Sequence, residues 1–174
     1  MDRPRTDHGH PALANLLGRW RGTTRLESGP WGAERTVDAE MTFTLVAGGS
    51  AVVQSYRHTE SDGSHFEGHG IFTVDPVRRD VLWYYVDSVS PGPDAPARCT
   101  WHGGDLQMER HTGAGSIRHT LRVRDGVLLD VAELRRDDSA GADLRIRSAA
   151  DGAAASYKPF MTSRYSRDPG VPAV

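Results

Sequence analysis

The sequence is nearly without cysteine and has no long hydrophobic run. Cys99 is the one cysteine in 174 residues, so neither an intrachain disulfide nor a metal site built from several cysteines can form. No apolar stretch approaches the ~20 residues that a membrane-spanning helix requires. The first ten residues also lack the apolar stretch of a signal peptide. We therefore expect no membrane span and a cytoplasmic location in a bacterial cell.

An excess of charge of either sign is lacking as well. The chain has 21 Lys and Arg against 23 Asp and Glu, which leaves a net charge of −2. Lys158 is the only lysine, so nearly all the basic residues are arginines. A preference for arginine over lysine, together with abundant Ala and Gly, is typical of a GC-rich genome. A nucleic acid partner, which needs a concentrated basic patch, is therefore not expected.

Most of the chain alternates between apolar and polar residues, which is the period-two pattern of β-strands. One short helix is predicted over residues 11–17, where Leu13, Leu16 and Leu17 share a face and Gly18 ends the helix. The sequence Asp125-Gly126 is a strong hairpin signal between two of the strands. Ten strands are predicted, over residues 19–26, 37–46, 51–59, 65–74, 81–88, 97–101, 106–112, 116–123, 127–135 and 157–165.

These strands favour an all-β fold that closes on itself. Connections of hairpin length let each strand pair with the next, and closure removes the exposed edges of an open sheet. We expect a single antiparallel barrel domain over residues 11–167, after a flexible N-terminus at 1–10. A long surface loop is predicted at 136–156, with a short strand at 144–146, and a disordered tail at 168–174.

Several short motifs resemble known proteins. Residues 16–22 contain Gly18-Arg19-Trp20-Arg21-Gly22, which is similar to the Gly-x-Trp-x-Gly opening of calycin-type barrels such as lipocalins and fatty-acid-binding proteins. The order and spacing of further segments, at 48–56, 66–75, 85–88 and 163–167, resemble the bacterial DUF1579 family. Tyr85 stands where that family usually has Trp, and the segment 136–156 is longer than the family pattern. The resemblance covers residues 12–167 and implies a calycin-like, ligand-binding barrel, but no reaction.

The resemblance extends to the haem-binding nitrobindin group, which shares the same opening. In that group the haem ligand is a histidine on a late strand. The last histidine of this chain is His119, so the closing strand has no such ligand. Haem or nitric-oxide binding is therefore only a second alternative, and no cofactor is expected.

Alternation also predicts which side chains face the barrel interior. Gly68 and Gly70 share a face with aromatic residues, where glycine relieves crowding. The predicted interior has apolar walls and sparse polar groups, as ligand cavities do, although a fully packed barrel would show the same pattern. We expect a small lipophilic molecule to bind there. The predicted contact residues are Trp20, Gln54, Tyr56, Phe66, Phe72, Trp83, Tyr85, Asp87, Met108 and His119.

An enzyme on the same barrel is the alternative, though it is not favoured. Asp87 paired with His119 or His58 could act as a general acid or base in an isomerase or cyclase working on a hydrophobic metabolite. A hydrogen bond that ties two strands together is the favoured explanation of such a pair, because most buried polar groups are simply satisfied by a partner. Likeness to fatty-acid-binding proteins makes Arg110 and Tyr165 candidates for gripping a carboxylate.

Neither a metal site nor a partner protein is indicated. His65, Glu67 and His69 alternate along one strand face, but they lie opposite the aromatic face and so on the solvent side. Residues i and i+4 of a strand lie ~13 Å apart, so at most two of the three could share an ion. No metal is expected. A homodimer formed through an outer sheet face is left open.

Overall fold

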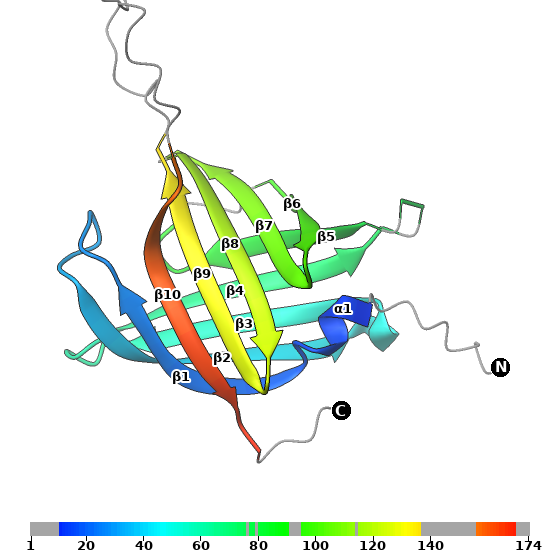
Figure 1. Ribbon diagram of the computed structural model, residues 1–174, viewed down its shortest axis with the longest axis horizontal. Helices are drawn as coiled ribbons and strands as arrows, with labels where there is room; N and C mark the ends of the chain where they lie inside the picture. The colour runs from blue at the N-terminus through cyan, green and yellow to red at the C-terminus, as the bar shows by residue number, and fades with distance from the viewer. Residues whose placement is uncertain are drawn as a thin grey trace, which may run out of the picture.

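Ten antiparallel strands close into a barrel in which each strand pairs with its sequence neighbours and β10 pairs with β1 (Figure 1). The computed structural model describes residues 11–75, 77–78, 80–90, 95–113, 115–136 and 156–169. Its elements are α1 (Pro11–Ala14), β1 (Gly18–Leu26), β2 (Arg35–Val46), the 3-10 turn η1 (Ala47–Gly49), β3 (Ala51–Thr59), β4 (His65–Val74), β5 (Val81–Asp87), β6 (Ala97–His102), β7 (Asp105–Thr112), β8 (Gly115–Arg124), β9 (Val127–Arg135) and β10 (Lys158–Arg167).

The predicted all-β barrel is confirmed, and the strand ends agree with the prediction within two residues. The hairpin at Asp125-Gly126 is also confirmed: both residues have positive φ (50° and 74°), as the type I′ turn between β8 and β9 requires. The predicted flexible start, the strand at 144–146 and most of the loop and tail segments lie outside the described residues. Within the predicted tail, the Asp168 N–H donates to the Arg19 carbonyl at 2.8 Å.

The N-terminal helix is shorter than predicted. It ends at Ala14 rather than residue 17. The N–H groups of Leu16 and Leu17 bond to carbonyls three residues back, at 3.0 and 3.3 Å, which is a tight turn rather than an α-helix. Gly18 follows with φ of 115° and turns the chain into β1. None of the described helices is long and apolar enough to cross a membrane.

The end of the barrel where β1 begins and α1 lies is here called the helix end (Figure 1). Trp20 is the third residue of β1. Its side chain is fully buried, and its indole N–H donates to the Leu16 carbonyl at 2.7 Å. Leu13 and Leu16 are buried beside it in the hydrophobic core. The indole and the helix together therefore fill this end of the barrel. The opposite end, where β1, β3, β5, β7 and β9 finish, is the loop end.

Two glycines of β4 make room for the aromatic interior. A Cβ atom at Gly68 would overlap the hydroxyl of Tyr85, and one at Gly70 would overlap the indole of Trp83 and the amide of Gln54. Both glycines are buried on the inner face. The predicted relief of crowding is therefore confirmed, and the largest fully buried side chains of the barrel are Trp20, Trp83, Tyr165, Phe72, Met41 and Met108.

Pairing between neighbouring strands of the barrel is least extensive where β6 lies between β5 and β7. Strands β5 and β6 share two register pairs, Leu82 with Arg98 and Trp83 with Ala97. In β7 the pairing with β6 reaches only to Met108. The loop-end halves of β5 and β7 therefore face each other without β6 between them.

Candidate functional site

The predicted contact residues lie on the inner face of the barrel, and most are less than one tenth exposed. Phe66 is half-buried against the core. Gln54 and Trp83 hold each other: the indole N–H donates to the amide oxygen at 3.0 Å, and the amide nitrogen lies 3.6 Å from the sulfur of Met41. These polar groups satisfy one another and fix the aromatic wall.

A row of hydrogen bonds leads from the centre of the barrel to the loop end. The Tyr56 hydroxyl lies 3.2 Å from the hydroxyl of Thr24 and 2.8 Å from His58 Nδ1. His58 Nε2 lies 3.3 Å from Glu60, whose carboxylate pairs with Arg35 at 2.7 Å. Burial lowers the pKa of His58 despite the neighbouring carboxylate. Both ring nitrogens of His58 therefore already have hydrogen-bond partners, Tyr56 and Glu60.

Asp87 does not meet either histidine. Its carboxylate accepts the N–H groups of Val89 and Ser90 at 3.0 and 2.7 Å and the Ser90 hydroxyl at 2.9 Å. One oxygen lies 3.5 Å from Arg110 Nη2, and both side chains are more than nine-tenths buried. The sequence hypothesis of an Asp87–His119 or Asp87–His58 pair is therefore corrected. Asp87 ends β5 at the loop end, where it caps a turn and ties β5 to β7.

His119 instead faces Asp130, a residue that the sequence analysis missed. His119 Nδ1 lies 3.6 Å from Asp130 Oδ1, with Asp130 2% exposed. The His119 ring stands at a steep angle to the Trp83 ring, 5.3 Å between centroids, and 6.1 Å from the Tyr85 ring. The signal for Asp130 was present, since alternation along 127–135 puts it on the apolar face with Leu128 and Ala132.

Three buried polar groups at this centre have an atom without a hydrogen-bond partner among the described residues: His119 Nε2, Asp130 Oδ1 and the Tyr165 hydroxyl. Tyr165 is 1% exposed, and the hydroxyls of Thr24 and Ser163 are near enough to lower its pKa slightly. They bond to each other at 2.7 Å, and neither makes a hydrogen bond of normal geometry with the Tyr165 hydroxyl. Burial raises the pKa of the Tyr165 hydroxyl well above its ordinary value, so it stays a neutral donor. The centre of the barrel thus combines aromatic walls with unsatisfied polar atoms.

The titration of the other two inner tyrosines is similar. Burial raises the pKa of both Tyr56 and Tyr85, and the Arg110 guanidinium lies 4.7 Å over the Tyr85 ring. Burial also raises the pKa of the Cys99 thiol to about 12. These groups therefore stay protonated and neutral at physiological pH, as hydroxyl donors and an unreactive thiol.

Metal ligation has no geometric basis in the described part of the chain, where no three His, Cys, Asp or Glu side chains gather to hold an ion. His65 and His69 are exposed on the outer face of β4, and His69 Nδ1 lies 3.1 Å from the Ser55 hydroxyl. They stand on the solvent side, as alternation predicted.

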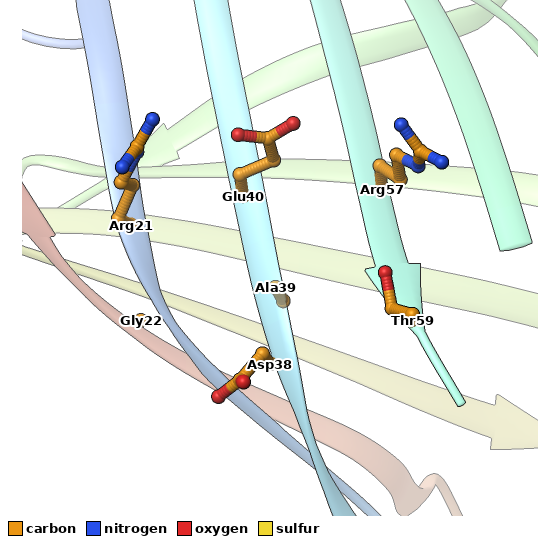
Figure 2. A pocket seen from close by; sticks show the side chains of 7 residues that line it. All are labelled: Arg21, Gly22, Asp38, Ala39, Glu40, Arg57 and Thr59. Carbon is orange, nitrogen blue, oxygen red and sulfur yellow. The ribbon is translucent and has the colours of Figure 1, made fainter. Parts of the chain in front are cut away.

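A polar groove of about 530 Å³ runs over the outer face of β1, β2 and β3 (Figure 2). Arg21, Glu40 and Arg57 lie side by side across the three strands. Glu40 also pairs with Arg19 at 2.8 Å. Opposite charges that alternate across neighbouring strands stabilise a sheet. The groove is open and charged, and it is separate from the barrel interior.

Structural comparison supports the fold. The crystal structure of Rv2717c from M. tuberculosis matches with a TM-score of 0.62 and 15% sequence identity, over 92% of this chain and 99% of that chain. A structure described as EF1p2_mFAP2b bound to DFHBI matches with a TM-score of 0.42 and 18% identity, over 90% and 97% of the two chains. At these identities the first likeness shows the fold alone, and the second adds nothing further.

Sequence comparison gives the family. Among curated proteins, none matches the chain at a significant level. The family described as "Protein of unknown function (DUF1579)" matches residues 5–167. This span confirms the resemblance seen at residues 12–167 and leaves only the two ends of the chain outside it. The protein therefore belongs to the DUF1579 family.

Proposed function

We propose that the barrel binds a small, largely apolar molecule in its interior, with the polar end of that molecule between His119, Asp130 and Tyr165. The observation that carries this proposal is the set of three unsatisfied polar atoms on side chains at least nine-tenths buried. An unpaired buried polar group costs about 1–3 kcal/mol. A ligand that supplies the missing hydrogen bonds regains this free energy.

The surrounding side chains support an apolar body for the ligand. Trp83, Tyr85 and Met108 belong to the buried core around His119. Small-molecule sites typically combine such walls with a few polar groups that orient the ligand. A barrel of ten strands also encloses more space than one of eight, whose interior side chains can just fill it.

The polar atoms favour a hydroxyl compound. Tyr165 is a neutral hydroxyl that donates, and Asp130 Oδ1 accepts. A phenol or alcohol can accept from the first and donate to the second with one oxygen. A plain hydrocarbon would leave both unsatisfied, and a fatty acid would bring a second carboxylate beside Asp130.

Binding is tested with a panel of lipophilic phenols, alcohols, fatty acids and hydrocarbons, measured by thermal shift and calorimetry. We expect phenols or alcohols to raise Tm. Tyr165→Phe and Asp130→Asn should each weaken their binding by about fivefold, because a net hydrogen bond contributes ~1 kcal/mol and 1.4 kcal/mol corresponds to a factor of ten.

The matched controls have side chains on the outer surface of the protein. Tyr84→Phe changes a tyrosine that is 43% exposed, and Asp125→Asn changes an exposed turn residue; neither should alter affinity. Equal affinities in Tyr165→Phe, Asp130→Asn and wild-type protein would contradict the proposal, as would a panel that leaves Tm unchanged throughout.

A further inference from the structure

We propose that His119, oriented by Asp130, transfers a proton to and from the molecule bound in the barrel, so that this molecule is a substrate. The inference rests on the proposed function. The substrate class is an apolar β,γ-unsaturated carbonyl compound, and the reaction is a double-bond isomerisation through a dienolate, whose oxygen takes the place of the phenol or alcohol oxygen in the proposed binding mode.

The strand register brings the two side chains together. His119 of β8 stands opposite Ala132 of β9, and Leu121 stands opposite Asp130. His119 and Asp130 are therefore diagonal neighbours on the inner face of an antiparallel pair, a spacing that long side chains bridge. The separation of 3.6 Å between Nδ1 and Oδ1 is slightly longer than a hydrogen bond. Such contacts in ligand-free sites commonly tighten when substrate binds.

The pair leaves one nitrogen of the imidazole for chemistry. When Asp130 accepts the Nδ1–H, the neutral ring keeps its lone pair on Nε2. That nitrogen is buried without a hydrogen-bond partner among the described residues. The nearby rings of Trp83 and Tyr85 limit the rotation of the imidazole and keep water away from it.

The other buried histidine is a poorer base because its two nitrogens are already used. His58 Nδ1 lies 2.8 Å from the Tyr56 hydroxyl and Nε2 lies 3.3 Å from Glu60. Phe66 stacks on the His58 ring at 5.3 Å, with 11° between the ring planes. Of the two inner histidines, His119 is the one with a carboxylate on one nitrogen and no partner on the other.

The step balances without any co-reactant. His119 Nε2 takes the proton from the carbon beside the carbonyl, the C–H electron pair forms a C=C bond, and the carbonyl π pair moves to oxygen. The neutral Tyr165 hydroxyl, which lies near enough to Asp130 to feel its charge, is the available donor for the enolate oxygen. The β,γ double bond of the substrate is conjugated with the new C=C bond, so the imidazolium returns the proton to the γ carbon, the double bond moves to the α,β position and the carbonyl re-forms.

The test uses 5-nitrobenzisoxazole, a flat apolar probe of buried bases. A base removes its C3 proton, the C–H electrons form a nitrile, and the N–O bond breaks to release a coloured phenolate. We expect wild-type protein to turn the probe over faster than an equal concentration of imidazole. His119→Gln should lower the rate by about 10²-fold or more while the probe still binds.

Two variants separate chemistry from folding. Asp130→Ala should lower turnover and shift the neutral His119 tautomer away from Nδ1–H, which ¹⁵N NMR of the ring reports directly. His102→Gln, on an exposed histidine, should change neither turnover nor binding.

The outcomes are distinct. Turnover at the wild-type rate in His119→Gln, a probe that binds without turnover, or a wild-type His119 without a proton on Nδ1 would each overturn the proton transfer and leave the binding function standing. A barrel that binds neither the probe nor any member of the lipophilic panel would overturn both.

Discussion

At the scale of single residues, the interior depends on glycines that stand where a side chain would collide with an aromatic ring. Gly68 faces the Tyr85 hydroxyl, and Gly70 faces the Trp83 indole. These contacts keep both rings on the inner face beside His119. The glycines of β4 are therefore needed for space, since neither has the positive φ of a turn residue.

Gly68→Ala should destabilise the barrel by about 1–3 kcal/mol, the usual cost of overpacking a core. The reason is the overlap of the new Cβ with the Tyr85 hydroxyl and the adjacent ring carbon. Adding Tyr85→Phe removes the hydroxyl and should recover part of the loss. Chemical denaturation measures all three stabilities.

Gly113→Ala is the control, because a Cβ at Gly113 meets no atom within 4 Å and its φ is not positive. It should leave the free energy of unfolding nearly unchanged. A Gly68→Ala protein as stable as Gly113→Ala, or a double variant less stable than Gly68→Ala alone, would show that the hydroxyl contact is not the constraint.

At the scale of the elements, the barrel wall is held between β5 and β7 by side chains rather than by a ladder. The loop-end half of β5 has no register pair in β6. Across that stretch, Asp87 of β5 lies 3.5 Å from Arg110 of β7, and the Arg110 guanidinium covers the Tyr85 ring. This stretch of wall is where we expect the barrel to open most easily.

Asp87→Asn should loosen that stretch selectively. Asparagine keeps the oxygen that accepts the Val89 and Ser90 N–H groups but loses the charge that faces Arg110. Removing one partner of a buried ion pair costs about 3 kcal/mol. Amide hydrogen exchange should accelerate in the loop-end halves of β5 and β7 and stay unchanged in β9.

Asp75→Asn is the matched control, since Asp75 caps a turn in the same way, accepting the N–H groups of Val77 and Arg78, at the helix end. It should not change exchange in β5 or β7. Uniform acceleration over all ten strands in Asp87→Asn would mean that the pair supports global stability rather than this stretch of wall.

At the scale of the whole molecule, the alternation of apolar and polar residues and the turn sequences predict most of the fold. The strand limits were predictable because the inner and outer faces differ in polarity. The turn at Asp125-Gly126 was predictable because this dipeptide by itself favours a type I′ hairpin turn. The helix was overestimated because three leucines at helical spacing suit the tight turn at residues 15–17 equally well. The alternation of apolar and polar residues, however, does not reveal that β6 is too short to pair along the full length of its neighbours β5 and β7.

The candidate site was less predictable for the same reason. Alternation correctly placed Asp87 and His119 on inner faces, but their partners depend on which strands meet across the barrel. Asp87 meets Arg110 only because β6 is short. His119 meets Asp130 because β8 and β9 form a hairpin in a fixed register, and that pairing could have been inferred from the predicted turn.

The proposed ligand site inside the barrel is tested most directly by a crystal structure of the protein with its tightest-binding phenol or alcohol. We predict ligand density inside the barrel, with the ligand oxygen within hydrogen-bond distance of at least two of His119 Nε2, Asp130 Oδ1 and the Tyr165 hydroxyl, and with the apolar body of the ligand against Trp83. Density confined to the outer groove of β1, β2 and β3, with the barrel interior closed by protein side chains alone, would contradict it.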